Sequence, residues 1–125
     1  MNYYNEKIKK LKAIKAPYKI QFFYEYGGEM FWARNNNSLL RFGSPINPYD
    51  LPISKESADK FKKYCEIWEI NMLNDMKKNK ESIPLPQDFA DWDLERLNNE
   101  TAILLKQTKR ELGEEYDLFE LDGYL

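Results

Sequence analysis

The chain has no histidine and a single cysteine, Cys65, among its 125 residues. Histidine is the commonest general base, the usual partner in catalytic triads and the commonest ligand of transition metals. Most familiar hydrolase mechanisms are therefore excluded. One cysteine cannot form an intramolecular disulfide, which agrees with a reducing compartment. We expect a protein that is not an enzyme and that carries no cofactor and no metal.

Long apolar runs are also missing. A membrane-spanning helix needs about 20 consecutive apolar residues, and a secretory signal needs an apolar segment near the N-terminus. The chain has neither, so we expect a cytoplasmic protein with no membrane partner. Hydrophobic residues make up 42% of the chain and aromatic residues 15%, which is enough for a packed core. The length fits a single domain over residues 1–125.

Charge is distributed unevenly along the chain. Residues 1–19 carry six Lys and one Glu, whereas residues 81–125 carry four basic and twelve acidic residues. The formal net charge of −2 therefore hides a basic N-terminal segment and an acidic C-terminal third. We therefore expect separate basic and acidic regions on the folded surface, unless folding brings the two segments together.

The basic segment predicts a short helix. Ile8, Leu11 and Ile14 recur every three residues, which favours a helix over residues 5–16 that ends before Pro17. Its lysines could contact phosphate groups of a nucleic acid, or the segment could be a solvated helix face or a strap across the acidic third of the same molecule. We favour the last two interpretations, because the isoelectric point near 5.3 is far from the basic character of nucleic-acid-binding domains. The lysines are Lys7, Lys9, Lys10, Lys12 and Lys15.

A β-hairpin is predicted next. Aromatic and β-branched residues fill 19–26 and 29–34, and Gly27-Gly28 supplies the positive φ angles of a tight turn. We interpret this glycine pair as a turn rather than an anion-binding loop, because a strand follows it instead of a helix. Residues 35–52 are rich in Asn and Pro, so we expect an irregular connection with a short extended piece at 38–42.

The first long helix begins after Ser54, a suitable N-cap, and extends to about Met76. Apolar residues recur there every three or four positions. Cys65 belongs to this stripe, so we interpret it as a core residue rather than a nucleophile. The stripe consists of Ala58, Phe61, Cys65, Trp68 and Met72.

A second long helix follows the loop at 77–87. Asp88 or Asp91 is expected to cap it, and Gly113 is expected to end it. Its buried stripe is Leu94, Leu97, Thr101, Leu104, Leu105, Thr108 and Leu112. A last strand is predicted over residues 116–121. These elements predict an α+β fold, in which an antiparallel sheet, formed by the hairpin and the C-terminal strand, has both long helices on one face.

Several short motifs lie along the chain: Tyr26-Gly27-Gly28, Phe31-Trp32, Asp50-Leu51-Pro52-Ile53-Ser54, Trp68, Asp88-Phe89, Glu111-Leu112-Gly113 and Tyr116-Asp117-Leu118. This series resembles a group of small bacterial proteins, some of which are similar to immunity proteins of contact-dependent growth inhibition and other polymorphic-toxin systems. The resemblance spans residues 20–121 and carries no assigned functional residue. It implies that the partner is a toxin.

We therefore expect a binding protein that neutralises a cognate toxin, most plausibly a basic nuclease, by occluding it. An acidic surface can steer a basic partner and cover its active site. Alternatives are a phage or mobile-element inhibitor of a defence complex, and a nucleic-acid-binding protein that uses the N-terminal lysines.

The expected partner-binding residues are acidic, with one aromatic anchor. That anchor, Trp92, could equally be a hydrophobic cover over the start of the second helix. The acidic residues of the first helical turn could likewise be ordinary cap and dipole partners. The set consists of Asp88, Asp91, Trp92, Asp93, Glu95, Glu114, Glu115 and Asp117.

Overall fold

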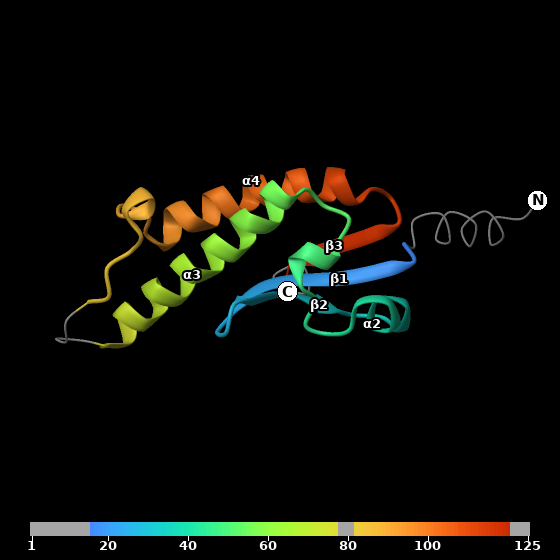
Figure 1. Ribbon diagram of the computed structural model, residues 1–125, viewed down its shortest axis with the longest axis horizontal. Helices are drawn as coiled ribbons and strands as arrows, with labels where there is room; N and C mark the ends of the chain where they lie inside the picture. Colours follow the sequence, from blue (N-terminus) through green and yellow to red (C-terminus); the bar gives the residue numbers. More distant parts are fainter. Residues whose placement is uncertain (1–15, 78–81, 121–125) are drawn as a thin grey trace, which may run out of the picture.

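The computed structural model describes residues 16–77 and 82–120. Three strands, three helices and two short 3₁₀ turns follow one another in this part of the chain (Figure 1). In chain order they are β1 (Tyr18–Glu25), β2 (Glu29–Ala33), α2 (Asn36–Phe42), η1 (Pro48–Asp50), α3 (Lys55–Lys77), η2 (Gln87–Phe89), α4 (Leu94–Leu112) and β3 (Tyr116–Glu120). The α+β class is confirmed. The helix predicted over 5–16 lies outside the described residues.

The predicted hairpin is present. β1 and β2 pair in antiparallel fashion, with Ile20 opposite Ala33 and Phe22 opposite Phe31. Gly27 connects them with φ 92°. Its N–H donates to the carboxylate of Glu69 on α3, so this amide already has an acceptor within the chain.

The sheet is mixed, so the prediction of an antiparallel sheet is wrong for its third strand. The strand order is β2-β1-β3, and β3 runs parallel to β1, with Tyr18 beside Tyr116 and Ile20 beside Leu118. A tight turn imposes antiparallel pairing only on the two strands that it joins. β3 is instead reached through two long helices, which return the chain to the end of the sheet where β1 begins. The Tyr18 N–H donates to the Glu115 carbonyl there at 3.0 Å.

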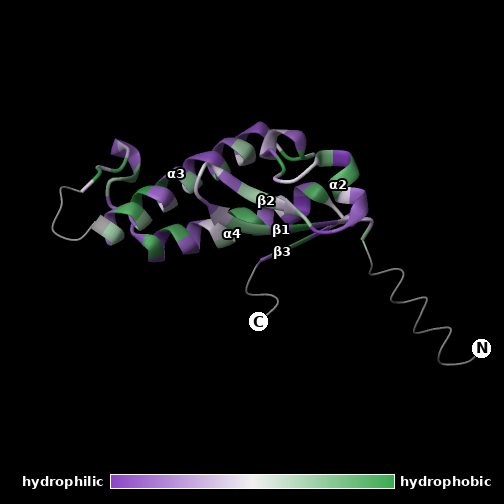
Figure 2. Cartoon of the chain, turned by 90° about the horizontal axis from the view of Figure 1, so that it is seen from below, coloured by the Kyte–Doolittle hydropathy of each residue, from purple (hydrophilic) through white to green (hydrophobic). Residues whose placement is uncertain are grey.

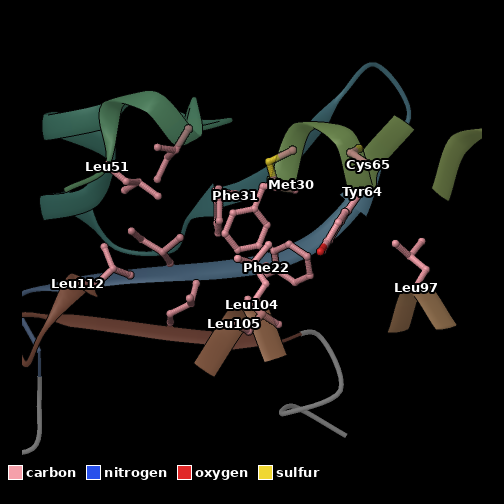
Figure 3. Packing of buried hydrophobic residues seen from close by; sticks show 14 of the residues in the cluster. Phe22, Met30, Phe31, Leu51, Tyr64, Cys65, Leu97, Leu104, Leu105 and Leu112 are labelled. Atoms are coloured by element: carbon pink, nitrogen blue, oxygen red, sulfur yellow. The ribbon is translucent and has the colours of Figure 1, made fainter. Parts of the chain in front are cut away.

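Both long helices lie on one face of the sheet, as expected (Figure 1). The core between these layers includes the aromatic side chains of Phe22 and Phe31 from the sheet (Figure 3). The Phe61 ring of α3 lies 4.8 Å from that of Phe31 and 5.6 Å from that of Phe22, between ring centroids. The buried stripe of α4 agrees with the sequence except at Leu94, which is only partly buried; it consists of Leu97, Thr101, Leu104, Leu105, Thr108 and Leu112. In the described residues, no helix is long and apolar enough to cross a membrane.

The connection after the hairpin contains a helix, α2, where we expected irregular chain with an extended piece at 38–42. Asn35 is its N-cap, since the Asn35 side chain accepts from the Ser38 N–H at 3.0 Å. Ser38 is buried and accepts from the Lys19 N–H at 2.9 Å, which attaches the helix to β1. Gly43, with φ 76°, ends the helix. Propensity did not reveal the helix because Asn is a poor helix former but a strong cap.

The predicted start of α3 is confirmed, because the Ser57 N–H donates to the Ser54 hydroxyl at 3.1 Å. Glu111, in the last turn of α4, reinforces this start. Its carboxylate accepts from the Ser54 N–H at 2.5 Å and from the Ser57 hydroxyl at 2.8 Å. Gly113 ends α4 as expected, with φ 80°.

Candidate partner-binding surface

The predicted acidic residues at the start of α4 form one exposed corner of the molecule. This acidic corner comprises Asp88, Asp91, Asp93 and Glu95, all of which are exposed. It is built by the short turn η2, which follows Pro86, and by the four residues between η2 and α4. The Trp92 N–H donates to the Phe89 carbonyl at 3.0 Å and closes this turn. Four carboxylates are thus displayed within eight residues.

Asp93 is the N-cap of α4, so the prediction of Asp88 or Asp91 is wrong. The Asp93 carboxylate accepts from the Arg96 N–H at 2.8 Å. The later start has a packing reason. The side chains of Phe89 and Trp92 both pack near Tyr64 of α3, and the regular helix begins only after the turn that carries them.

Aromatic packing against α3 holds the acidic corner in place. The Trp92 ring centroid lies 5.2 Å from that of Tyr64 on α3 and 4.8 Å from that of Phe89. Asn71 donates to the Trp92 carbonyl at 3.2 Å. Only 7% of Trp92 is exposed. In the free protein Trp92 is therefore the hydrophobic cover that the sequence offered as one alternative, and its role as a partner anchor stays a prediction.

Arg96 is the cation of this corner. Its Nη1 lies 2.7 Å from Asp91 Oδ2, and its guanidinium carbon lies 4.8 Å from the Trp92 ring centroid. Asp91 is thereby partly neutralised, and Asp93 is engaged as the cap. Asp88 and Glu95 have no ion pair within the described part of the chain. These two carboxylates are the groups best placed to attract a basic partner.

A groove of about 670 Å³ adjoins the acidic corner. Tyr64, Phe89 and Trp92 line it with aromatic surface, and charged side chains of α3 and α4 surround them. Several of these charges are paired on α3 itself. Lys60 lies 3.4 Å from Glu56 across one helical turn. The groove therefore offers an apolar surface that is surrounded by acidic and basic side chains in nearly equal number.

The other predicted acidic residues lie at the opposite end of α4. Glu114 and Glu115 occupy the turn after the helix, and Asp117 lies on β3. With a rise of 1.5 Å per residue, the 19 residues of α4 separate the two groups by about 28 Å. The last turn of α4 contains Lys109 and Arg110, which interrupt the acidic surface. The structure does not bring all eight predicted residues together.

No protein-family model, curated protein or solved structure matches the chain. The resemblance to immunity proteins therefore rests on the sequence motifs alone.

Sequence reasoning missed Arg96 and Tyr64. The contact of Arg96 with Trp92 has no local signal, because Trp92 precedes the N-cap Asp93 and the two residues are not a helical i, i+4 pair. Tyr64 lies beside Cys65 and widens the apolar stripe of α3, as helices against a large core require. Only this second signal is present in the sequence.

Cys65 is a core residue, as predicted. It is fully buried, and its Sγ lies 3.5 Å from the Glu25 carbonyl at the end of β1. Burial raises the pKa of the Cys65 thiol to about 11, which suppresses the reactive thiolate at neutral pH. Across residues 16–77 and 82–120 no cluster of three or more His, Cys, Asp or Glu side chains is arranged to hold a metal ion.

Proposed function

We propose that this protein binds a basic nuclease toxin and neutralises it by covering its active site. The observation that carries the proposal is the acidic corner, where four exposed carboxylates lie within eight residues and, in the described part of the chain, only Asp91 is ion-paired, with Arg96. A nuclease must attract phosphate, so its active-site surface is basic. An acidic corner is complementary to such a surface and increases the rate of encounter.

Rigidity favours this use of the corner. Asp93 is fixed as a helix cap, Asp91 is fixed by Arg96, and the turn rests on Tyr64 and Phe89. Side chains held in place before binding lose less conformational entropy when a partner arrives. The adjoining groove would receive an apolar side chain of the toxin, since interface cores combine apolar pockets with a polar edge.

In this role the chain binds its partner in the cytoplasm, without catalysis and without a cofactor. The acidic corner is the primary contact. Glu114, Glu115 and Asp117 take part only with a partner that extends along α4, because about 28 Å separates the two groups.

The test uses the product of the adjacent gene as the candidate toxin. We expect Asp88→Lys and Glu95→Lys to weaken binding at least about tenfold each and to reduce protection from the toxin, with most of the loss in the association rate. Neither carboxylate has an ion pair within the described part of the chain, so the fold should survive both changes. Affinity is measured by surface plasmon resonance at two salt concentrations.

Asp50→Lys is the matched control. Asp50 is also an exposed aspartate in a 3₁₀ turn, but it lies in η1, next to the first turn of α3. Its reversal should leave affinity unchanged. If both corner variants bind and protect as well as the unaltered protein, the acidic corner is not the binding surface. If the basic partner does not bind at all, the proposed class of partner is wrong.

A further inference from the structure

The sheet face opposite the long helices carries a cluster of cationic and amide side chains near the start of β1. Ile20 and Phe22 point into the core, so the alternate residues Lys19 and Gln21 face the other way. Arg34 follows β2 directly, and its N–H donates to the Lys19 carbonyl at 2.9 Å. Lys19 and Arg34 are therefore neighbours across the two strands. Figure 2 shows this end of the sheet next to α2.

Arg34 is held in position by a buried neutral group. Its Nε donates to Gln21 Oε1 at 2.5 Å, and only 3% of Gln21 is exposed. An amide orients the guanidinium without cancelling its charge. The two terminal nitrogens of Arg34 keep the paired donor geometry that suits the oxygens of a phosphate or carboxylate.

Lys19 and Arg34 line a pocket of about 360 Å³ together with Asn35, Asn36 and Asn37. No acidic residue lines it. Asn35 and Asn37 each donate to the Pro17 carbonyl, at 2.9 and 3.0 Å, which fixes the wall of the pocket. The Asn36 side chain is exposed and has no hydrogen bond within residues 16–77 and 82–120.

Neither cation of the pocket is neutralised inside the described part of the chain. Lys19 and Arg34 form no ion pair there. The acidic residue beside them is Asp117, which is the register partner of Lys19 on β3 but does not line the pocket. Two cations on adjacent strands repel each other, and a bound anion would relieve that repulsion.

We propose that this pocket, formed by Lys19, Arg34 and the amide of Asn36, binds a phosphate group. The guanidinium contacts two phosphate oxygens, the ammonium of Lys19 adds a point charge, and the Asn36 amide donates to a third oxygen. The phosphate is either free or part of a nucleotide chain. This site is separate from the acidic corner and does not depend on the proposed toxin partner.

Binding is tested by NMR on the full chain, with inorganic phosphate added at constant ionic strength. The side-chain N–H signals of Arg34 and Asn36 should shift and reach saturation. Arg34→Ala and Lys19→Gln should each weaken binding about tenfold or more, because each removes a charge-assisted contact. Lys19→Gln is included because Arg34→Ala removes the partner of buried Gln21 and can disturb the fold.

Two further variants sharpen the result. Asp117→Asn should tighten phosphate binding severalfold, because it removes a negative charge next to Lys19. Lys106→Gln, on the exposed side of α4, is the matched control and should have no effect. Shifts without saturation, or equal affinity in the unaltered chain, Arg34→Ala and Lys19→Gln, would overturn the proposal.

A short single-stranded RNA distinguishes the two sources of phosphate. Tighter binding of RNA than of inorganic phosphate, with the same loss in Arg34→Ala and Lys19→Gln, identifies a nucleotide chain as the source. Equal or weaker binding of RNA identifies free phosphate. RNA binding that neither variant alters, together with no response to inorganic phosphate, rejects the site.

Discussion

At the scale of single residues, Glu111 joins the end of α4 to the start of α3. It accepts hydrogen bonds from the Ser54 N–H and the Ser57 hydroxyl, so one carboxylate satisfies two donors at a helix start. We expect Glu111→Ala to lower the free energy of unfolding by about 1–3 kcal/mol, because two hydrogen bonds to a charged group are lost. Glu114→Ala, one turn further along the chain and exposed, should change it by less than about 0.5 kcal/mol. Urea unfolding measures both.

The same residue makes stability depend on pH. Partial burial opposes ionisation of Glu111, but hydrogen bonds from Ser54, Ser57 and Gln107 outweigh it and leave the pKa below its ordinary value. A lowered pKa in the folded state means that the stabilisation is fully present above the unfolded pKa of about 4.3 and is lost as pH falls through the folded pKa. The difference between the unaltered protein and Glu111→Ala should therefore shrink between about pH 6 and pH 3. A constant difference would show that ionisation of Glu111 is not involved.

At the scale of elements, the hairpin turn is fastened to α3 from both sides. Glu69 accepts from the Gly27 N–H, and Lys62 donates to the Gly28 carbonyl at 3.1 Å. Gly28 has φ 82°, and a Cβ built on it meets no atom within 4 Å. Gly28→Ala should therefore cost about 1–2 kcal/mol through backbone strain alone. Gly28→Asn should cost less, because Asn tolerates positive φ.

Thermal and urea unfolding of both Gly28 variants test this interpretation. Equal losses for Ala and Asn would point to a lost contact instead of backbone conformation. Enhanced stability in the alanine variant would show that the turn does not keep its positive φ.

At the scale of the whole molecule, the elements that could be predicted from sequence are those with a local signal. The α4 stripe follows from helical spacing, and the hairpin follows from Gly27-Gly28 between two aromatic runs. The direction of β3 could not be predicted, because it depends on how two long helices return the chain. α2 was missed for a related reason: Ser38 is buried by contact with β1, and a burial pattern that depends on tertiary contacts has no local period.

The candidate surface could be predicted only in part. Asp88, Asp91, Asp93 and Glu95 lie together because they are close in sequence. Glu114, Glu115 and Asp117 are separated from them by the full length of α4, which charge counting along the chain cannot show. The burial of Trp92 depends on Tyr64, 28 residues earlier, and the groove beside it arises only when α3 and η2 come together.

Removal of β3 tests how far the whole molecule folds as one unit. A chain that ends at Gly113 loses the strand that pairs with β1 and the buried side chain of Leu118. We expect such a chain to lose cooperative urea unfolding. Leu118→Ala in the full chain should remain cooperative but be about 2–5 kcal/mol less stable. A sharp transition in the shortened chain would show that the rest of the protein folds cooperatively without β3.

The parallel pairing of β1 with β3 also determines when the sheet can be completed during synthesis. β1 is translated nearly a hundred residues before its second neighbour, β3. Until then one side of β1 presents unpaired N–H and carbonyl groups next to aromatic side chains, which is the kind of edge at which chains associate with one another. During this interval the central strand is an edge strand, and the solubility of the nascent protein depends on how quickly the helices cover the apolar face of the hairpin.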